Sequence, residues 1–156
     1  MTSVHLAASR TYPATVEHAF DLVVTMPLPE LFRHRYGPLP PIRSAEGFTE
    51  PWGTVGQTRR ITLSDGGTLV ETLTEVERPG GFGYHIDSIT GAMKPLVASI
   101  EGAWSFEPAG TGVRITWAWD VEPASTVAGY LMPVFGRLWR GYARQALENL
   151  EGPLLA

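Results

Sequence analysis

Two polar residues fall within segments that we predict to be largely buried strands, where they could act on a ligand. Arg59 lies in QTRRITLS and Tyr84 lies in FGYHIDSI. A buried guanidinium needs a hydrogen-bond partner, and the two side chains together could orient a carboxylate or carbonyl group. Alternatively, Arg59 lies near the end of its strand and reaches the solvent, or it pairs with an acid such as Asp21 or Glu17.

Glu71, Glu75 and Glu77 have the close spacing that acid–base catalysis by paired carboxylates would need. They alternate with other residues along TLVETLTEVE, and we place all three on the solvent side of a strand. A solvent-exposed carboxylate lacks the raised pKa that a general acid requires. We therefore expect a cross-strand ion pair between Glu71 and Arg60, and we assign no catalytic residue.

The sequence holds no pattern that indicates a metal or a cofactor. It has no cysteine, which excludes thiol catalysis, cysteine zinc sites and disulfides. The four histidines are not spaced as a ligand set, and no HExxH, GxSxG, Walker or GxGxxG motif occurs. We therefore expect neither a metal nor a cofactor.

Length, composition and charge indicate a globular protein without a nucleic-acid partner. The 156 residues are 44% hydrophobic and 18% charged, with a formal net charge of −4. This length suits a single domain over residues 1–156, and the negative charge is unfavourable for binding nucleic acid or an anionic membrane surface. The sequence shows neither a signal peptide nor the ~18 apolar residues of a membrane span. We expect a cytoplasmic protein.

Alternating apolar residues predict the strands that must position these side chains. The clearest strand is VRITWAWDVE, residues 113–122, in which every second residue is large and apolar. Two short helices are expected at 15–24 and 29–36. The other expected strands lie at 4–12, 42–48, 57–64, 68–77, 82–89 and 96–106.

Turns between these strands fix their expected pairing. A two-residue turn at 65–66 sets Arg59 opposite Thr72. The turn between the last two strands sets Gly102 opposite Trp117, and Gly102 would leave space there. Because residues opposite each other share a face of the sheet, the inner face would collect Ile61, Leu63, Val70, Val76, Phe82, Tyr84, Ile86, Ile100, Trp104, Phe106, Ile115, Trp117 and Trp119.

A long helix over residues 124–150 is expected to cover this inner face. Ser125 would cap it, and Pro133 would kink it or mark its start. The apolar stripe of the helix consists of Phe135, Trp139, Tyr142 and Ala146. The opposite stripe, which we expect either to be solvated or to contact a partner such as a second copy in a homodimer, consists of Arg137, Arg140 and Arg144.

The order of these elements, and several local matches, resemble a known superfamily. The matching segments are YPATVEHAFDLV, GQTRRITLSDGGTLVETLTEVERPGGFGYHI, EGAWSFEPAGTGVRITWAW and RQALENL. They resemble the START/SRPBCC (helix-grip, Bet-v-1-like) superfamily and its bacterial polyketide cyclase/dehydrase-like branch. The resemblance implies an α+β fold in which a curved antiparallel sheet of about seven strands wraps around a long C-terminal helix, with two short helices after the first strand. No catalytic motif of a particular cyclase matches residue by residue.

The resemblance further implies a cavity between the sheet and the C-terminal helix. Such a cavity would bind a hydrophobic or amphipathic small molecule, such as a lipid, a polyketide or an isoprenoid. From the residues alone, the aromatic inner face fits solid core as well as a pocket wall. The residues that we predict to contact the ligand are Arg59, Thr72, Tyr84, Ile100, Trp104, Phe106, Trp117, Trp119, Phe135, Trp139 and Tyr142.

Two other functions fit the same sequence. In a polyketide cyclase or aromatase, the pocket would fold a poly-β-keto chain, and Tyr84, Arg59 or a nearby His or Glu would transfer protons. An inward-facing acid or base would favour that enzyme, and the expected pairing provides no convincing one. A co-chaperone-like domain that binds a protein would instead have a filled interior and an apolar outer patch, and the charged outer face is evidence against it.

Overall fold

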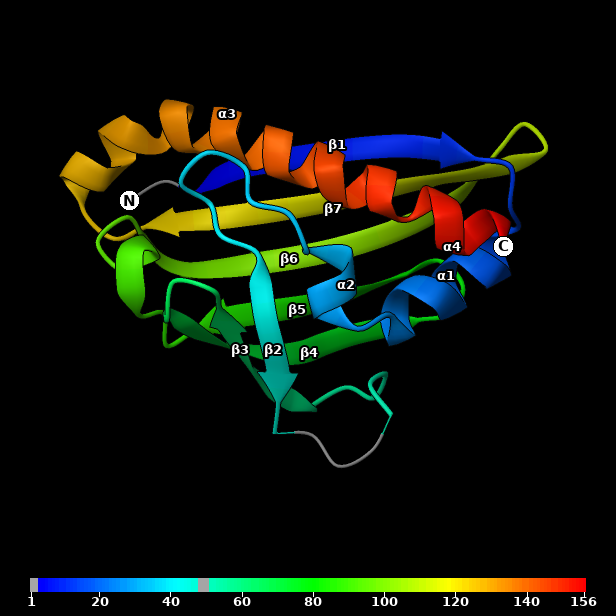
Figure 1. Cartoon of the computed structure of the whole chain (residues 1–156), viewed down its shortest axis with the longest axis horizontal. Helices are drawn as coiled ribbons and strands as arrows, with labels where there is room; N and C mark the ends of the chain where they lie inside the picture. Colours follow the sequence, from blue (N-terminus) through cyan, green and yellow to red (C-terminus); the bar gives the residue numbers. More distant parts are fainter. Residues whose placement is uncertain (1–2, 48–50) are drawn as a thin grey trace.

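Seven antiparallel strands form one sheet in the order β1-β7-β6-β5-β4-β3-β2 (Figure 1). The structure is a computed structural model that describes residues 3–47 and 51–156 of the chain. The strands are β1 (Val4–Tyr12), β2 (Ile42–Glu46), β3 (Thr58–Leu63), β4 (Thr68–Glu77), β5 (Gly81–Asp87), β6 (Val97–Ala109) and β7 (Gly112–Pro123). The strand expected at 42–48 corresponds to β2, and residue 48 lies outside the described residues.

The pairing of β6 with β7 differs from the expected pairing by two residues. A two-residue turn joins the strands, so Ala109 pairs with Gly112 and Gly102 pairs with Trp119 rather than with Trp117. Because the side-chain period of a strand is two, an even shift leaves every residue on its expected face. Trp104 and Trp117 therefore still face inward, where both are buried.

The pairing of β3 with β4 differs by one residue, and this odd shift reverses the faces of β4. The chain turns through residues 64–67, where Leu63 N–H donates to the carbonyl of Gly67, so the turn is longer than two residues. Arg59 therefore pairs with Glu71 and not with Thr72. The expectation that Glu71 lies on the solvent face and Val70 on the inner face is wrong.

A register shift in β4 explains how this strand has reversed faces next to β3 and still pairs with β5. Between Leu73 and Glu75 the pairing with β5 changes by one residue, which marks a bulge at Thr74. On the turn side of the bulge Val76 pairs with Phe82, and beyond it Leu73 pairs with Tyr84. The inner face of β4 consequently carries Leu69, Glu71 and Leu73, all of which are buried.

The helices begin where the sequence provides caps. They are α1 (Val16–Thr25), α2 (Leu28–Leu31), η1 (Gly91–Met93), α3 (Thr126–Asn149) and α4 (Glu151–Leu155). Thr15 Oγ1 accepts from the backbone of His18, and Ser125 Oγ accepts from the backbone of Ala128. Pro133 lies inside α3 and does not mark its start, and the second short helix is a single turn rather than residues 29–36.

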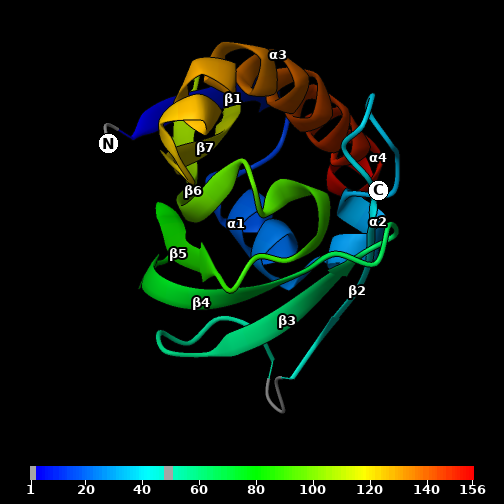
Figure 2. The same ribbon diagram turned by 90° about the vertical axis from the view of Figure 1, so that its left-hand side faces the viewer.

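Helix α3 lies across the open side of the curved sheet, as the end-on view in Figure 2 shows. It packs mainly against β1 and β7, while α1 packs against β6 and β7, and α2 against β2. The approach of α3 to β1 is close, since a Cβ at Gly136 would lie 2.9 Å from Cδ2 of Leu6. The helix-grip α+β fold expected from the sequence is therefore confirmed.

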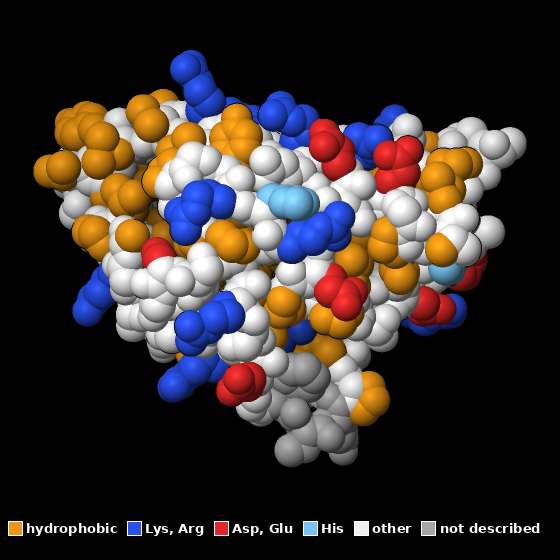
Figure 3. All heavy atoms as spheres, in the orientation of Figure 1, with side chains coloured by type: hydrophobic (Ala, Val, Ile, Leu, Met, Phe, Trp, Pro, Cys, Tyr) orange, Lys and Arg blue, Asp and Glu red, His pale blue; other side chains and the backbone are white. Residues whose placement is uncertain are grey.

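The exposed side of α3 changes character along its length. Near its start the exposed side chains are apolar, and they form a cluster over this end of the helix in Figure 3: Val127, Tyr130, Leu131 and Val134. Further along they are Arg137, Arg140 and Arg144. In the described part of the chain, no helix is both long enough and apolar enough to cross a membrane.

Candidate ligand-binding site

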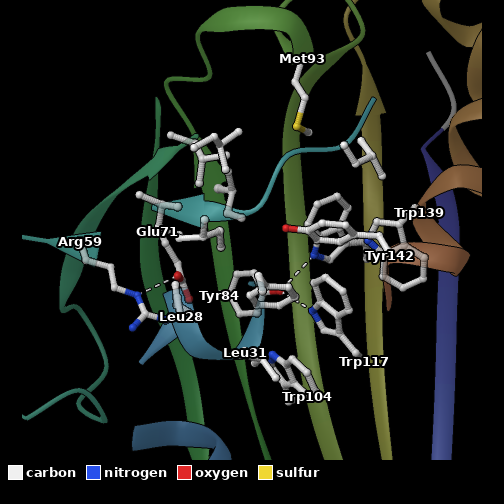
Figure 4. Close-up of a pocket in the computed structure, with 18 of the residues that line it drawn as sticks. Leu28, Leu31, Arg59, Glu71, Tyr84, Met93, Trp104, Trp117, Trp139 and Tyr142 are labelled. Atoms are coloured by element: carbon white, nitrogen blue, oxygen red, sulfur yellow. Dashed lines mark hydrogen bonds and ion pairs between the residues drawn. The ribbon is translucent and has the colours of Figure 1, made fainter. Parts of the chain in front are cut away.

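A pocket lies between the inner face of the sheet, α3 and the short helices α1 and α2 (Figure 4). The empty space between its lining atoms is about 850 Å³ when the part open to solvent is included. The room that the centre of a water molecule can reach is only about 90 Å³. The pocket is therefore narrow, and many of its lining side chains are also buried residues of the core.

All five tryptophans of the chain line this pocket: Trp52, Trp104, Trp117, Trp119 and Trp139. The ring of Trp117 contacts three of the others, while Trp52 lies against Arg59. The Trp117 ring stacks on Trp104 with a centroid distance of 5.3 Å, and its centroid is 4.9 Å from that of Trp139. Trp119 meets it edge-on at 5.4 Å. These separations are those of favourable aromatic pairs, so the wall is a continuous aromatic surface.

The ring of Tyr84 crosses strand β6 to reach the tryptophans of β7. Tyr84 on β5 pairs with Gly102 on β6, and Gly102 pairs with Trp119 on β7. A Cβ at Gly102 would lie only 2.1 Å from Cζ of Tyr84. The space expected at Gly102 is therefore occupied by the tyrosine ring, and the glycine is required because no side chain fits beneath that ring.

Two indole groups hold the hydroxyl of Tyr84. Nε1–H of Trp117 donates to Oη of Tyr84 over 2.7 Å, and Nε1–H of Trp119 donates to it over 3.0 Å. Burial raises the pKa of Tyr84 far above its ordinary value, and the nearby charge of Glu71 acts in the same direction. The phenol therefore stays protonated at any physiological pH.

A buried ion pair forms a second polar group of the pocket. Arg59 is 8% exposed and Glu71 is 3% exposed, and Nε–H of Arg59 donates to Oε1 of Glu71 over 2.9 Å. The guanidinium also lies over the ring of Trp52, 3.9 Å from its centroid. Burial raises the pKa of Glu71, and the positive charge of Arg59 opposes that shift.

This ion pair corrects three expectations from the sequence. Glu71 pairs with Arg59 rather than with Arg60, because of the one-residue shift between β3 and β4. Arg59 is buried and paired, so it does not extend to the solvent. Its partner is neither Glu17 nor Asp21, and Asp21 instead pairs with Arg78 at the surface.

Tyr142 connects α3 to the segment that follows α2. Its hydroxyl donates to the carbonyl of Pro40 over 2.9 Å, and its ring stacks on Phe32 with an interplanar angle of 7°. Burial raises the pKa of Tyr142 well above its ordinary value. The Tyr142 hydroxyl therefore donates its proton to a backbone carbonyl, whereas the Tyr84 hydroxyl accepts two hydrogen bonds.

The structure brings most of the predicted ligand contacts together around the pocket. Those in its lining are Arg59, Tyr84, Trp104, Trp117, Trp119, Phe135, Trp139 and Tyr142. The others lie outside it. Thr72 falls on the outer face of β4 because of the register shift, Ile100 is enclosed in the core, and Phe106 packs against the rings of Phe20 and Phe82.

Sequence reasoning missed Glu71, Trp52 and the contribution of the short helices to the lining, including Val24, Leu28 and Phe32. A signal for Glu71 was present, since Leu69 and Leu73 flank it at the spacing of one strand face. Nothing in the sequence pattern signalled Trp52, which lies outside the helices and strands.

The histidines on the sheet lie away from the pocket. His5 pairs with Asp120 over 2.7 Å, and His85 pairs with Glu101, all on the outer face. Among residues 3–47 and 51–156, no three His, Asp or Glu side chains are grouped so as to hold a metal ion.

Comparisons with known proteins agree with this architecture. The model of the family described as "Polyketide cyclase / dehydrase and lipid transport" matches residues 3–153. Among solved structures, the chain is similar to ginseng major latex-like protein 151 from Panax ginseng, with 14% identity, a TM-score of 0.75 and 100% coverage of both chains. It is also similar to the protein TTHA0849 from Thermus thermophilus, with 17% identity, a TM-score of 0.73 and 97% coverage of both.

A third similar structure is that of Ara h 8.0201, with 16% identity, a TM-score of 0.68 and 98% coverage of both chains. At such identities the likeness establishes the fold alone. No curated protein matches the sequence.

The raised pKa of Glu71 gives stability a definite dependence on pH. The folded chain holds the Glu71 proton more tightly than the unfolded chain does, so ionisation above the ordinary pKa of 4.5 weakens folding. We expect the free energy of unfolding of the wild type, minus that of Glu71→Gln, to fall as the pH rises from 4.5 to 8. Urea titrations over this range measure it, with the exposed-face variant Glu75→Gln as the control. A difference that rises with pH would mean that Arg59 outweighs burial.

Gly102→Ala should destabilise the fold by about 1–3 kcal/mol, because its Cβ overlaps the ring of Tyr84. The matched control is Gly129→Ala. Gly129 lies in α3 with nothing within 4 Å of an added Cβ, so alanine there should be neutral or stabilising by up to about 1 kcal/mol. Both free energies of unfolding come from urea denaturation. Equal stability of the Gly102→Ala variant and the wild type would show that the Tyr84 ring does not lie over β6.

Proposed function

Because the chain belongs to the polyketide cyclase/dehydrase and lipid transport family, we propose that it binds a small hydrophobic or amphipathic molecule between the sheet and α3. The observation that carries this proposal is the lining. Five indole rings and several aliphatic side chains surround a few polar groups, and that composition is typical of small-molecule pockets. Burial of apolar ligand surface, at roughly 25 cal/mol per Å² before the cost of association, would supply the affinity.

The walls of the pocket favour a compact, flat ligand. Trp104, Trp117 and Trp139 present ring faces and edges to the pocket, and the room of about 90 Å³ for water centres is small. The planar ring system of a polyketide would contact these rings, and so would a short isoprenoid. A long lipid chain would require the lining side chains to move.

We further propose that the ligand contacts Tyr84 and Arg59 at its polar groups. The apolar contacts would come from Trp104, Trp117, Trp119, Phe135, Trp139 and Tyr142. Thr72, Ile100 and Phe106 leave the set of proposed contacts, because they do not line the pocket.

One observation favours an enzyme as the second candidate function. Glu71 provides the inward-facing acid that the expected strand pairing lacked, and it lines the same pocket as Tyr84. A carboxyl group with a raised pKa and a phenol are groups that could transfer protons while a poly-β-keto chain cyclises. Arg59 would position the carboxyl group in that reaction.

Filling the pocket should abolish binding of an apolar probe. Ile86 faces the pocket from β5, and Ile86→Trp places a large ring in it. We expect the fluorescence of N-phenyl-1-naphthylamine to rise on binding to the wild type, and its affinity to fall at least about tenfold in Ile86→Trp. The matched control is Val70→Trp, which adds the same ring to the opposite face of β4. Absence of binding to the wild type, together with a ligand-free mass in native mass spectrometry, would contradict the proposal.

The enzyme and the binding protein give different results for Glu71→Gln. If the chain is a cyclase, this variant should lose turnover of a synthetic poly-β-ketone thioester while N-phenyl-1-naphthylamine still binds. Product analysis by liquid chromatography and mass spectrometry measures the turnover. Equal product yields with the wild type, with Glu71→Gln and without protein would contradict the hypothesis that the chain is a cyclase.

A further inference from the structure

The hydroxyl proton of Tyr84 has no acceptor among the described residues. An indole N–H can only donate a hydrogen bond, so in both of its bonds to indoles the tyrosine oxygen is the acceptor. These two bonds occupy the acceptor positions of the oxygen and leave the O–H to donate elsewhere. Tyr84 is 5% exposed, so bulk water does not reach it freely. A buried donor without an acceptor is unfavourable, and a ligand could relieve it.

The hydroxyl of Tyr84 belongs to a residue that lines the pocket. Figure 4 shows the hydroxyl end of Tyr84 between the indole nitrogens of two tryptophans, one of which is the labelled Trp117. Both nitrogens belong to residues of β7. Because Tyr84 lines the same pocket as Trp139 and Tyr142, a molecule bound there could supply the acceptor for its O–H.

A second donor without an acceptor lies at the same end of the pocket. Nε1–H of Trp139 is buried and has no hydrogen-bond partner in the described part of the chain. The ring of Trp139 lies 4.9 Å from that of Trp117 and 5.6 Å from that of Trp119, centroid to centroid. Among the described residues, the aromatic end of the pocket thus holds two donors that lack acceptors. A ligand group that accepts hydrogen bonds would satisfy them.

We propose that the pocket recognises a planar conjugated ketone, whose carbonyl oxygen accepts the hydrogen bond of Tyr84 while its rings lie against the tryptophans. This inference rests on the proposed ligand binding. A ketone oxygen has acceptor positions and no proton, so it satisfies the free donor and brings no further donor that would need an acceptor. A carboxylate is disfavoured because it would lose its hydration in a buried apolar pocket that already contains Glu71.

A matched pair of probes, 9-fluorenone and fluorene, tests the inference. They share one flat ring skeleton and differ in the carbonyl group. Equilibrium dialysis gives the affinity of each, and we expect Tyr84→Phe to lower the ratio of ketone to hydrocarbon affinity at least about fivefold. The matched control is Tyr12→Phe. The hydroxyl of Tyr12 is also buried, but it donates to the carbonyl of Leu147 and does not line the pocket, so the ratio should stay within about twofold of the wild type.

A measurement on the wild type alone makes the test independent of how the variants fold. The infrared carbonyl stretch of bound 9-fluorenone should lie at a lower wavenumber than in hexane, because it accepts a hydrogen bond. A stretch unchanged from hexane, or an equal affinity ratio in the wild type and Tyr84→Phe, would overturn the inference while fluorene binding leaves the proposed function standing. If neither probe binds, the proposed function and the inference fail together.

Discussion

The ring of Tyr84, which crosses β6 above Gly102, is the contact on which the inner wall depends. It connects β5 to Trp117 and Trp119 on β7, across the strand between them, through two hydrogen bonds. Each neutral hydrogen bond of this kind contributes about 1 kcal/mol. The larger effect is geometric, because the fixed tyrosine orients two indole rings and these position Trp104 and Trp139. The glycine beneath the ring, the aromatic cluster and the pocket are thus parts of one arrangement.

The two polar groups of the pocket differ in chemical character. Arg59 and Glu71 pair with each other through one hydrogen bond, and the guanidinium lies over the ring of Trp52. Separating a buried pair of this kind leaves an uncompensated charge and is strongly unfavourable, so it is suited to hold its position. At the aromatic end Tyr84 and Trp139 retain donors that have no acceptor within residues 3–47 and 51–156. This asymmetry would give a bound molecule a preferred orientation.

The fold could be predicted from the sequence because the alternation of apolar residues along the strands tolerates small errors in strand pairing. A two-residue error between β6 and β7 left Trp104, Trp117 and Trp119 on the correct face. A one-residue error in the expected pairing of β3 with β4 reversed the two faces of β4. Glu71 was therefore expected on the outer face, whereas it lies on the inner face. The length of the turn at 64–67 and the bulge at Thr74 caused that error, since both depend on backbone geometry that alternation does not encode. Trp52 was missed because a lining residue outside regular structure has no periodicity.

If the aromatic core is also the wall of a ligand site, as we propose, the indole N–H signals of the tryptophans report it most directly. A ¹H–¹⁵N spectrum of the protein labelled at tryptophan would be recorded without and with saturating N-phenyl-1-naphthylamine. We predict that the signals of Trp104, Trp117, Trp119 and Trp139 shift on binding, and that the hydrogen-bonded N–H groups of Trp117 and Trp119 exchange slowest with water. Binding of the probe with all indole signals unmoved would contradict this proposal, because the rings would then be packed core and the ligand would lie elsewhere.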